Sequence, residues 1–242
     1  EEEGDDEQVE ESRVTRYRAV VARGNYLSQD RLDIKYAIKE LCRWMGKPRN
    51  KDWRRLIRLS KYLVGRERYI NEYKYQDEVG KLDVWTDTDY AGCRETRKST
   101  SGGLIMLGTH LIKGWSATQR VIALSSGEAE YYRVVRGAAE AMGTQSILRD
   151  MGVTLRIRLK EDSSAAKGIA ERTGLGKLRH VEVNQLWVQE KVKNKVIELT
   201  KVKRVDNLAD ALTKYVGNED LGKHMRGTHV KVEWGRHEIM PE

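Results

Sequence analysis

The spacing of apolar residues changes along this chain, and that change restricts its fold more than any other feature. Three short runs of strand character, punctuated by glycines, come first, at residues 82–87, 103–107 and 111–116. An Ala-rich helical pattern follows at about residues 128–149, and a strand then alternates apolar with basic residues up to Asp162. The remaining pattern predicts helices, one strand and a last helix, at about residues 165–172, 181–192, 196–202 and 207–214. The order β-β-β-α-β-α-α-β-α indicates an α/β fold.

The residues before this region have a helical period instead. Apolar residues recur at helical spacing over residues 30–45 and 53–63, and Pro48 lies in the turn between them. These patterns predict an antiparallel helix pair within a helical segment of residues 13–75. The polar stretch NEYKYQDEVG, residues 71–80, is the expected boundary to the strand-rich region.

Composition excludes several classes of protein. The chain has no long apolar run, which argues against a membrane span and a secretory signal and predicts a soluble, intracellular protein. Its two cysteines, Cys42 and Cys93, are far apart and lack the spacing of metal ligands. We therefore expect two reduced, structural thiols and no disulfide scaffold or zinc site.

Charge is distributed unevenly, and it points to a polyanionic partner. Residues 1–12 carry eight acidic residues and no basic one, so we expect them to be disordered. The remainder therefore has a larger basic excess than the net charge of +8. Residues 43–68 alone hold ten basic and two acidic residues, interleaved with aromatics. This stretch either contacts a nucleic-acid backbone or forms a solvated helix face.

Four acidic residues stand at the edges of predicted elements: Asp87, Glu130, Asp162 and Asp210. Hydrolysis of a phosphodiester needs an activated water and a neutralised leaving oxygen, and two divalent ions roughly 3.5–4 Å apart provide both. Magnesium prefers carboxylate oxygens as ligands, and clustered carboxylates without a cation repel one another. The four acids therefore predict a two-metal nuclease centre.

At these residues the sequence resembles the ribonuclease H domain of copia-type LTR retrotransposon Pol polyproteins. The similar blocks are WTDTDYAG, RKSTSGG, GWSATQRVIALSSGEAEYY, EDSSAAKGIA, LRHVEVNQLWVQEKV and NLADALTK, in that order. They cover residues 81–216 and leave residues 217–242 as a C-terminal tail. Residues 13–75 resemble the reverse-transcriptase thumb and connection region that precedes this domain in the same polyproteins.

The resemblance implies a ribonuclease H-like mixed five-stranded sheet flanked by helices, preceded by a small helical segment. It also implies an endonuclease that cuts the RNA strand of RNA/DNA hybrids, with two Mg²⁺ or Mn²⁺ ions held by Asp87, Glu130, Asp162 and Asp210. Asp89 and Glu128 lie two residues from two of these acids and are the alternative ligands. The further expected partner is the polymerase part of the same polyprotein, in a cytoplasmic particle or the nucleus.

Further residues of the similar blocks are candidates for nucleic-acid contacts: Arg97, Lys98, Ser99, Ser125, Ser126 and His180. Ordinary turn chemistry is the alternative role for the first five, and a structural role is the alternative for His180.

Two departures from the family pattern qualify the functional prediction. The chain contains no YxDD polymerase motif, so it lacks the polymerase palm, and no histidine stands between Val196 and Asp210. The missing histidine bears on catalytic turnover rather than on metal binding. The main rival to a nuclease is a catalytically silent or domesticated nucleic-acid-binding module of the same fold. An integrase-like strand-transfer enzyme is less favoured, because such enzymes rely on three acids.

Overall fold

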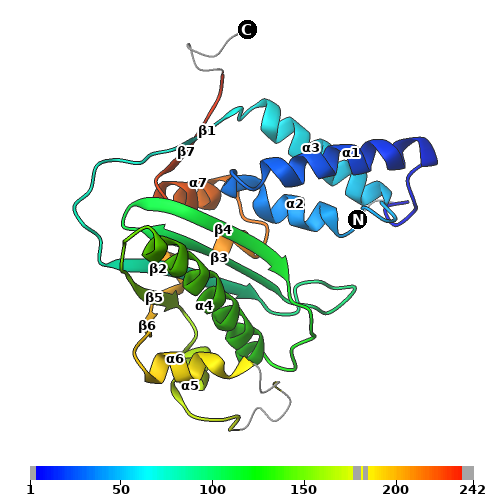
Figure 1. The fold of residues 1–242 in the computed structure, drawn as a ribbon. Helices are drawn as coiled ribbons and strands as arrows, with labels where there is room; N and C mark the ends of the chain where they lie inside the picture. Colours follow the sequence, from blue (N-terminus) through cyan, green and yellow to red (C-terminus); the bar gives the residue numbers. More distant parts are fainter. Residues whose placement is uncertain (1–3, 177–180, 182–184, 236–242) are drawn as a thin grey trace. The chain divides into compact units, whose positions relative to one another are not determined.

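The computed structural model of the chain describes residues 4–176, 181 and 185–235. These residues form two compact units (Figure 1). Unit 1 takes in the described residues up to Asn71 and those from Val230 onward, and unit 2 runs from Glu72 to His229. The chain therefore leaves unit 1, completes unit 2 and returns to unit 1.

Unit 2 is built on a five-stranded mixed sheet in the order β4-β3-β2-β5-β6. Its strands are β2 (Lys81–Asp89), β3 (Thr100–Leu107), β4 (His110–Thr118), β5 (Arg156–Glu161) and β6 (Ile197–Lys201). The first three form an antiparallel meander, and β5 pairs in parallel with both β2 and β6. Together with its flanking helices, this sheet confirms the predicted fold class.

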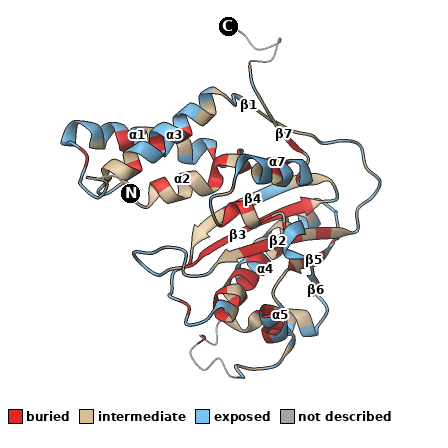
Figure 2. Cartoon of the chain, turned by 180° about the vertical axis from the view of Figure 1, so that it is seen from behind, coloured by how far each residue is buried: buried red, intermediate tan, exposed pale blue. Residues whose placement is uncertain are grey.

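The helices of unit 2 lie between its later strands in sequence, except for the last helix, which follows the last strand of the sheet. They are α4 (Ser126–Asp150), α5 (Ser164–Glu171), α6 (Trp187–Lys193) and α7 (Asn218–Gly227). Alternate residues of the strands, such as Val84 and Leu159, are buried with α4 residues such as Tyr131 and Val134 (Figure 2). Because successive strand residues point to opposite faces, the apolar alternation in the sequence gives the sheet its core face.

The two adjacent glycines of β3 show that both faces of the sheet are covered. A Cβ added to Gly103 would lie 2.1 Å from the Trp115 ring, which belongs to the core shared with α4. A Cβ added to Gly102 would lie 2.7 Å from Cβ of Leu212, in the short 3₁₀ turn η4 (Asp210–Leu212). Only residues without side chains let β3 approach its neighbours this closely on both faces.

Unit 1 is a group of helices with a two-stranded sheet. Its elements are α1 (Glu11–Leu27), η1 (Leu32–Ile34), α2 (Lys35–Cys42), α3 (Asn50–Val64), β1 (Arg68–Asn71) and β7 (Val230–Glu233). Its core includes Tyr17 and Val21 of α1, Ile38 of α2 and Leu56 of α3. The antiparallel pairing of β1 with β7 joins parts of the chain that are far apart in sequence.

The acidic N-terminal segment differs from its expected disorder. The described residues from Gly4 onward contact the start of α3: the backbone N–H groups of Asn50 and Lys51 donate to the carbonyls of Glu7 and Asp5, at 2.9 and 3.1 Å. The Asp5 carboxylate pairs with Arg54. The acidic residues are ordered because the first turn of α3 supplies both unpaired N–H donors and cations.

The C-terminal third differs in two further ways. In place of the predicted helix at about residues 207–214 there is the 3₁₀ turn η4, and a second 3₁₀ turn, η3 (Arg204–Asp206), precedes it. The Asn207 side chain accepts a hydrogen bond from the Ala209 N–H at 3.1 Å, which competes with helical pairing of the backbone. The segment expected as a tail contains α7 and β7 instead.

Candidate functional site

The candidate site lies where two parallel strands of unit 2 separate. The pairing of β2 with β5 ends at Trp85 and Lys160. Beyond that pair, β2 carries Asp87 and β5 is followed by Asp162, with buried Glu161 between. Carboxyl ends of adjacent parallel strands meet at one edge of the sheet, so these acids come together there.

Arg133 fills the fork between the two strands. Its side chain is 1% exposed and enters from α4. Nη1 donates to the Thr86 carbonyl at 2.9 Å, and Nη2 donates to Oδ1 of Asp162 at 2.8 Å. The guanidinium also pairs with Asp87 at 3.5 Å and with Glu161 at 3.8 Å. One buried cation is therefore shared by three carboxylates.

Asp87 is the most buried of the four predicted acids in the described structure. Burial raises the pKa of its carboxyl, the Thr213 hydroxyl and Arg133 oppose that rise, and Asp210 and Asp162 add to it. The Thr213 hydroxyl donates to Oδ2 of Asp87 at 2.5 Å. The three acids lie close together, because Arg133 pairs with both Asp87 and Asp162 and the Thr213 hydroxyl also donates to the Asp210 carbonyl at 3.0 Å.

Asp210 reaches this edge through the 3₁₀ turns. The Asn207 amide donates to the Thr86 carbonyl at 2.9 Å, which ties this segment to the same opened strand end that Arg133 contacts. Asp210 itself pairs with Nζ of Lys214 at 2.6 Å. A pocket of about 480 Å³ beside it is lined by Lys214, Lys223 and His224, among others. Burial lowers the pKa of His224, whereas the nearby Asp210 carboxylate raises it and so opposes the shift.

Glu130 and Glu128 have different surroundings. Glu130 accepts a hydrogen bond from the Ser163 hydroxyl, next to Asp162. Glu128 instead accepts from the Leu124 N–H at 2.8 Å and from the Tyr132 hydroxyl at 2.9 Å, at the start of α4. Glu128 thus belongs to the helix cap, and Glu130 faces the carboxylate cluster.

Asp87 and Asp89 are also distinguished by their contacts. Strand β2 continues through Asp89, so its period of two places both residues toward one face. The carboxylate of Asp89, however, lies over the following turn: Oδ2 would be 1.7 Å from a Cβ added to Gly92. Asp89 therefore contacts the turn, while Asp87 contacts Thr213 and Arg133.

Two predicted contact residues have structural partners. The Ser99 hydroxyl accepts from the Ala91 N–H at 3.0 Å, and the Ser125 hydroxyl accepts from the Glu128 N–H at 3.2 Å as the N-cap of α4. Arg97, with a φ of 56°, and Ser126 are exposed, whereas Lys98 is partly exposed. Their nucleic-acid contacts stay predictions, and His180 lies outside the described residues.

Glu161 gives the stability of unit 2 a pH dependence. Burial raises the pKa of its carboxyl to about 7, Arg133 opposes the rise, and Asp162 and Glu130 add to it. The folded state therefore holds this proton more tightly than the unfolded state, where the ordinary value is 4.5. The stabilising contribution is complete below pH 4.5 and is lost as pH rises through 7.

We expect Glu161→Gln to remove this dependence. Relative to the variant, the wild-type chain should lose about 1–3 kcal/mol of unfolding free energy between pH 4.5 and pH 8. Urea denaturation of both proteins at the two pH values measures the difference. If the unfolding free energies of the wild-type chain and the variant differed by the same amount at both pH values, the pH dependence would not come from Glu161.

The carboxylates suit a divalent ion by the chemistry of their oxygens but not by their arrangement. Their oxygens are the right kind of ligand for Mg²⁺ or Mn²⁺. Their arrangement does not fit, because among the described residues no three His, Cys, Asp or Glu side chains are grouped so that they could hold a metal ion. Arg133 and Lys214 pair with Asp162 and Asp210 instead.

Comparisons with known proteins identify the relatives of this chain. No protein-family model matches it. The Pol polyprotein of transposon RE2 from Arabidopsis thaliana is 29% identical over 203 residues, which are 83% of this chain and 14% of that protein. The Pol polyprotein of transposon TNT 1-94 from Nicotiana tabacum is 27% identical over 203 residues, or 82% of this chain and 15% of that protein.

The homologues of this chain are therefore Pol polyproteins of copia-type transposons, which confirms the resemblance seen in the sequence blocks. The chain spans about one seventh of the length of these curated relatives. A solved structure of LC11-RNase H1, isolated from compost, is 18% identical, with coverage of 61% of this chain and 99% of that one and a TM-score of 0.39.

Several residues at the site were not predicted from the sequence. These are Arg133, Glu161, Asn207, Thr213, Lys214 and His224. For Arg133 the available signal was Gly137 one turn later: a Cβ there would lie 2.6 Å from Thr86, so this side of α4 packs closely on the sheet.

Among the residues that the structure describes, none of the helices has the length and apolar character needed to cross a membrane.

Proposed function

We propose that unit 2 is a ribonuclease H-type endonuclease that hydrolyses the RNA strand of RNA/DNA hybrids during retrotransposon reverse transcription. Water would attack the phosphorus, and the bond from phosphorus to the 3′ oxygen would break, leaving a 5′-phosphate and a 3′-hydroxyl. The observation that supports this is the convergence of Asp87, Asp162 and Asp210 from three separate elements: Arg133 pairs with the first two, and the Thr213 hydroxyl contacts both Asp87 and the Asp210 carbonyl. Similarity to retrotransposon Pol polyproteins makes this chemistry the first to test.

The proposal includes two Mg²⁺ or Mn²⁺ ions as cofactor and the polymerase part of the same polyprotein as partner. Divalent ions activate water and neutralise a leaving oxygen. The described contacts show what such an ion would have to displace: the pairing of Asp162 with Arg133 and that of Asp210 with Lys214. Location in a cytoplasmic particle or the nucleus is likewise part of the proposal.

The deciding experiment incubates the full chain with a hybrid labelled on its RNA strand, in Mg²⁺ and separately in Mn²⁺. Duplex DNA and duplex RNA of the same sequence are the controls. We expect metal-dependent loss of the RNA strand from the hybrid alone. Binding of the hybrid without cleavage in either metal would reject the nuclease.

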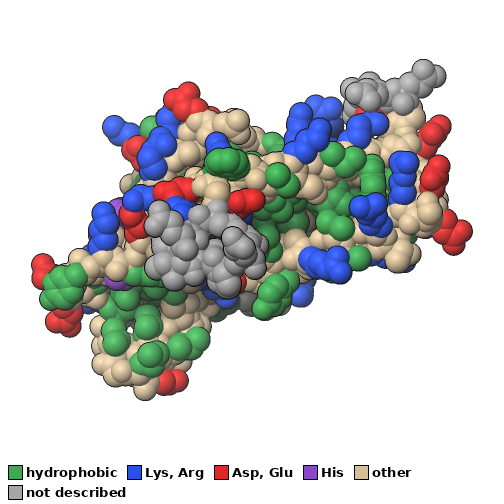
Figure 3. Space-filling view, turned by 90° about the horizontal axis from the view of Figure 1, so that it is seen from above, with side chains coloured by type: hydrophobic (Ala, Val, Ile, Leu, Met, Phe, Trp, Pro, Cys, Tyr) green, Lys and Arg blue, Asp and Glu red, His purple; other side chains and the backbone are tan. Residues whose placement is uncertain are grey.

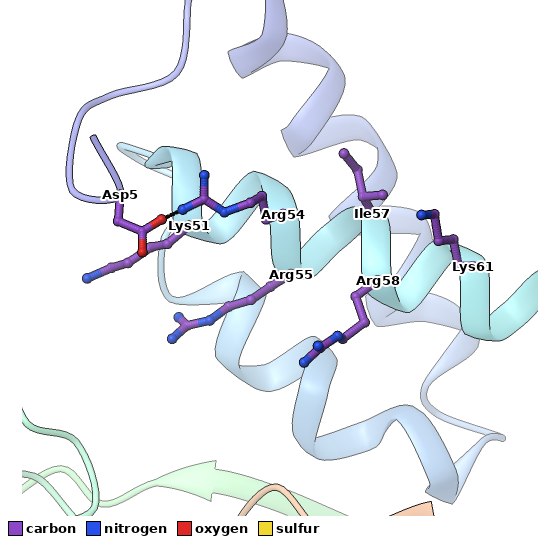
Figure 4. A pocket seen from close by; sticks show the side chains of 7 residues that line it. All are labelled: Asp5, Lys51, Arg54, Arg55, Ile57, Arg58 and Lys61. Carbon is purple, nitrogen blue, oxygen red and sulfur yellow. Dashed lines mark ion pairs between the residues drawn. The ribbon is translucent and has the colours of Figure 1, made fainter. Parts of the chain in front are cut away.

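A catalytically silent nucleic-acid-binding module is the second candidate, and two observations favour it. Arg133 occupies the centre of the carboxylate cluster. In addition, α3 presents a basic surface that lines a pocket of about 680 Å³ together with Asp5 (Figure 4). The basic residues of this surface are Lys51, Arg54, Arg55, Arg58 and Lys61. Lys and Arg side chains are also frequent on the face seen in Figure 3. Such a surface suits the phosphate backbone of a nucleic acid.

We expect the double substitution Arg55→Gln with Arg58→Gln to weaken hybrid binding and its dependence on salt. Each lost phosphate contact lowers the slope of log affinity against log salt by about 0.9, so the pair should lower it by about 2. Fluorescence anisotropy at several salt concentrations measures the slope. Arg16→Gln with Arg23→Gln on α1 is the control of equal charge, and an equal loss there would exclude a specific α3 surface.

A further inference from the structure

We propose that the Arg133 guanidinium is the resident cation of the carboxylate cluster and competes with a divalent metal ion for Asp87 and Asp162. The proposal rests on the proposed function only in taking these acids as the metal-facing groups. It concerns metal binding, so it can hold or fail whether or not the chain cleaves RNA.

The geometry of the guanidinium is the first step of the inference. Nη2 contacts Oδ1 of Asp162 at 2.8 Å, and Nη1 lies 3.5 Å from Oδ1 of Asp87. A metal ion would need direct bonds of about 2.0–2.1 Å to carboxylate oxygens such as these. The hydrogen bond from Arg133 lies on the Asp162 oxygen, so an ion bound there would have the guanidinium charge beside it and would compete with it for the carboxylate.

The anchoring of Arg133 is the second step. Its backbone lies within α4, its side chain is buried, and Nη1 also donates to the Thr86 carbonyl at 2.9 Å. That carbonyl lies just beyond the last residue of β2 that pairs with β5. An arginine held at three points cannot turn away into solvent as an exposed lysine can, and it stays charged at every accessible pH.

The charge balance is the third step. Glu161 and Asp87 are buried next to Asp162, and a buried carboxylate needs a compensating cation. Arg133 supplies that charge without any ion. Such internal neutralisation accounts for the finding that the described His, Cys, Asp and Glu side chains form no group of three able to hold a metal ion.

The test measures Mn²⁺ binding by electron paramagnetic resonance and by thermal unfolding with and without Mn²⁺. The variants are Arg133→Met, which keeps the side-chain volume, and Arg133→Met with Glu161→Gln, which also removes a buried carboxylate that would be left without its cation. Arg136→Met, one turn later on α4 with a half-exposed side chain, is the control. Circular dichroism verifies that each variant is folded.

We expect the double variant to bind Mn²⁺ at least tenfold more tightly than the wild-type chain and to gain more thermal stability from it. Arg136→Met should behave as the wild type does. Equal Mn²⁺ affinity of the wild-type chain and the folded double variant would overturn the proposal. Tighter Mn²⁺ binding by the variant would support the proposal whether or not the wild-type chain cleaves a hybrid, so a failure of the nuclease proposal is distinguished from a failure of this one.

Discussion

Asp162→Asn is expected to abolish hybrid cleavage, lowering the initial rate on the order of 10³-fold or more, as loss of a central catalytic group does. The substitution removes the negative charge but keeps an amide oxygen that still accepts the hydrogen bond from Arg133. The fold should therefore survive, and the loss should be chemical. The measurement is the rate of appearance of cut RNA from a labelled hybrid, with urea unfolding of the same protein preparation.

Two matched variants make this prediction specific. Glu128→Gln removes the charge of the carboxylate at the start of α4. It should lower the free energy of unfolding by about 1 kcal/mol and change the rate of cleavage only a few-fold. Asp89→Asn alters a side chain that lies over Gly92 and should also keep its activity. An active Asp162→Asn protein, or a folded but inactive Glu128→Gln protein, would show that the acids have been assigned wrongly.

Tyr17→Ala is expected to unfold unit 1 while unit 2 stays folded. Tyr17 is fully buried, and its hydroxyl donates to the Leu41 carbonyl at 2.9 Å, so it joins α1 to α2. Removal of a buried aromatic side chain costs about 3–5 kcal/mol, a large part of the stability of a small helical unit. Amide hydrogen exchange followed by peptide analysis measures the loss separately in α1–α3 and in the sheet.

The controls for this prediction lie on the same helix. Tyr17→Phe keeps the ring and loses only the hydrogen bond, so it should cost about 1–3 kcal/mol. Tyr26 is 82% exposed, and Tyr26→Ala should change stability by no more than about 0.5 kcal/mol. If Tyr17→Ala left the exchange of α1–α3 unchanged, the core assigned to unit 1 would be wrong.

The strands and the long helix were predictable because their apolar residues have one period each. The alternation in β2 and β5 and the Ala-rich run of α4 all lie where the sequence placed them. The 3₁₀ turns were not predictable in the same way. Residues 207–214 have a helical apolar pattern, but the Asn207 side chain binds Ala209 and Thr86, and the second contact is visible only in the folded chain.

The choice among neighbouring acids was predictable only in part. The sequence favoured Asp87 over Asp89 and Glu130 over Glu128, and the contacts of Asp89 with its turn and of Glu128 with the helix cap agree with that preference. The role of all four acids in metal binding stays a prediction. The central position of Arg133 was not predicted, because a single arginine within an Ala-rich helix looks like part of a solvated face until the sheet is placed beneath it.

The pairing of β1 with β7 closes unit 1 around a stretch of chain that contains all of unit 2. Bringing these strands together closes a loop that contains all of unit 2, and the entropy cost of closure grows with the length of a flexible loop. Once unit 2 is folded, its two ends are already adjacent, because the Glu72 N–H donates to the His229 carbonyl at 3.1 Å. We therefore expect the β1–β7 pairing to form after unit 2 has folded, because only then does its closing loop no longer have to be ordered.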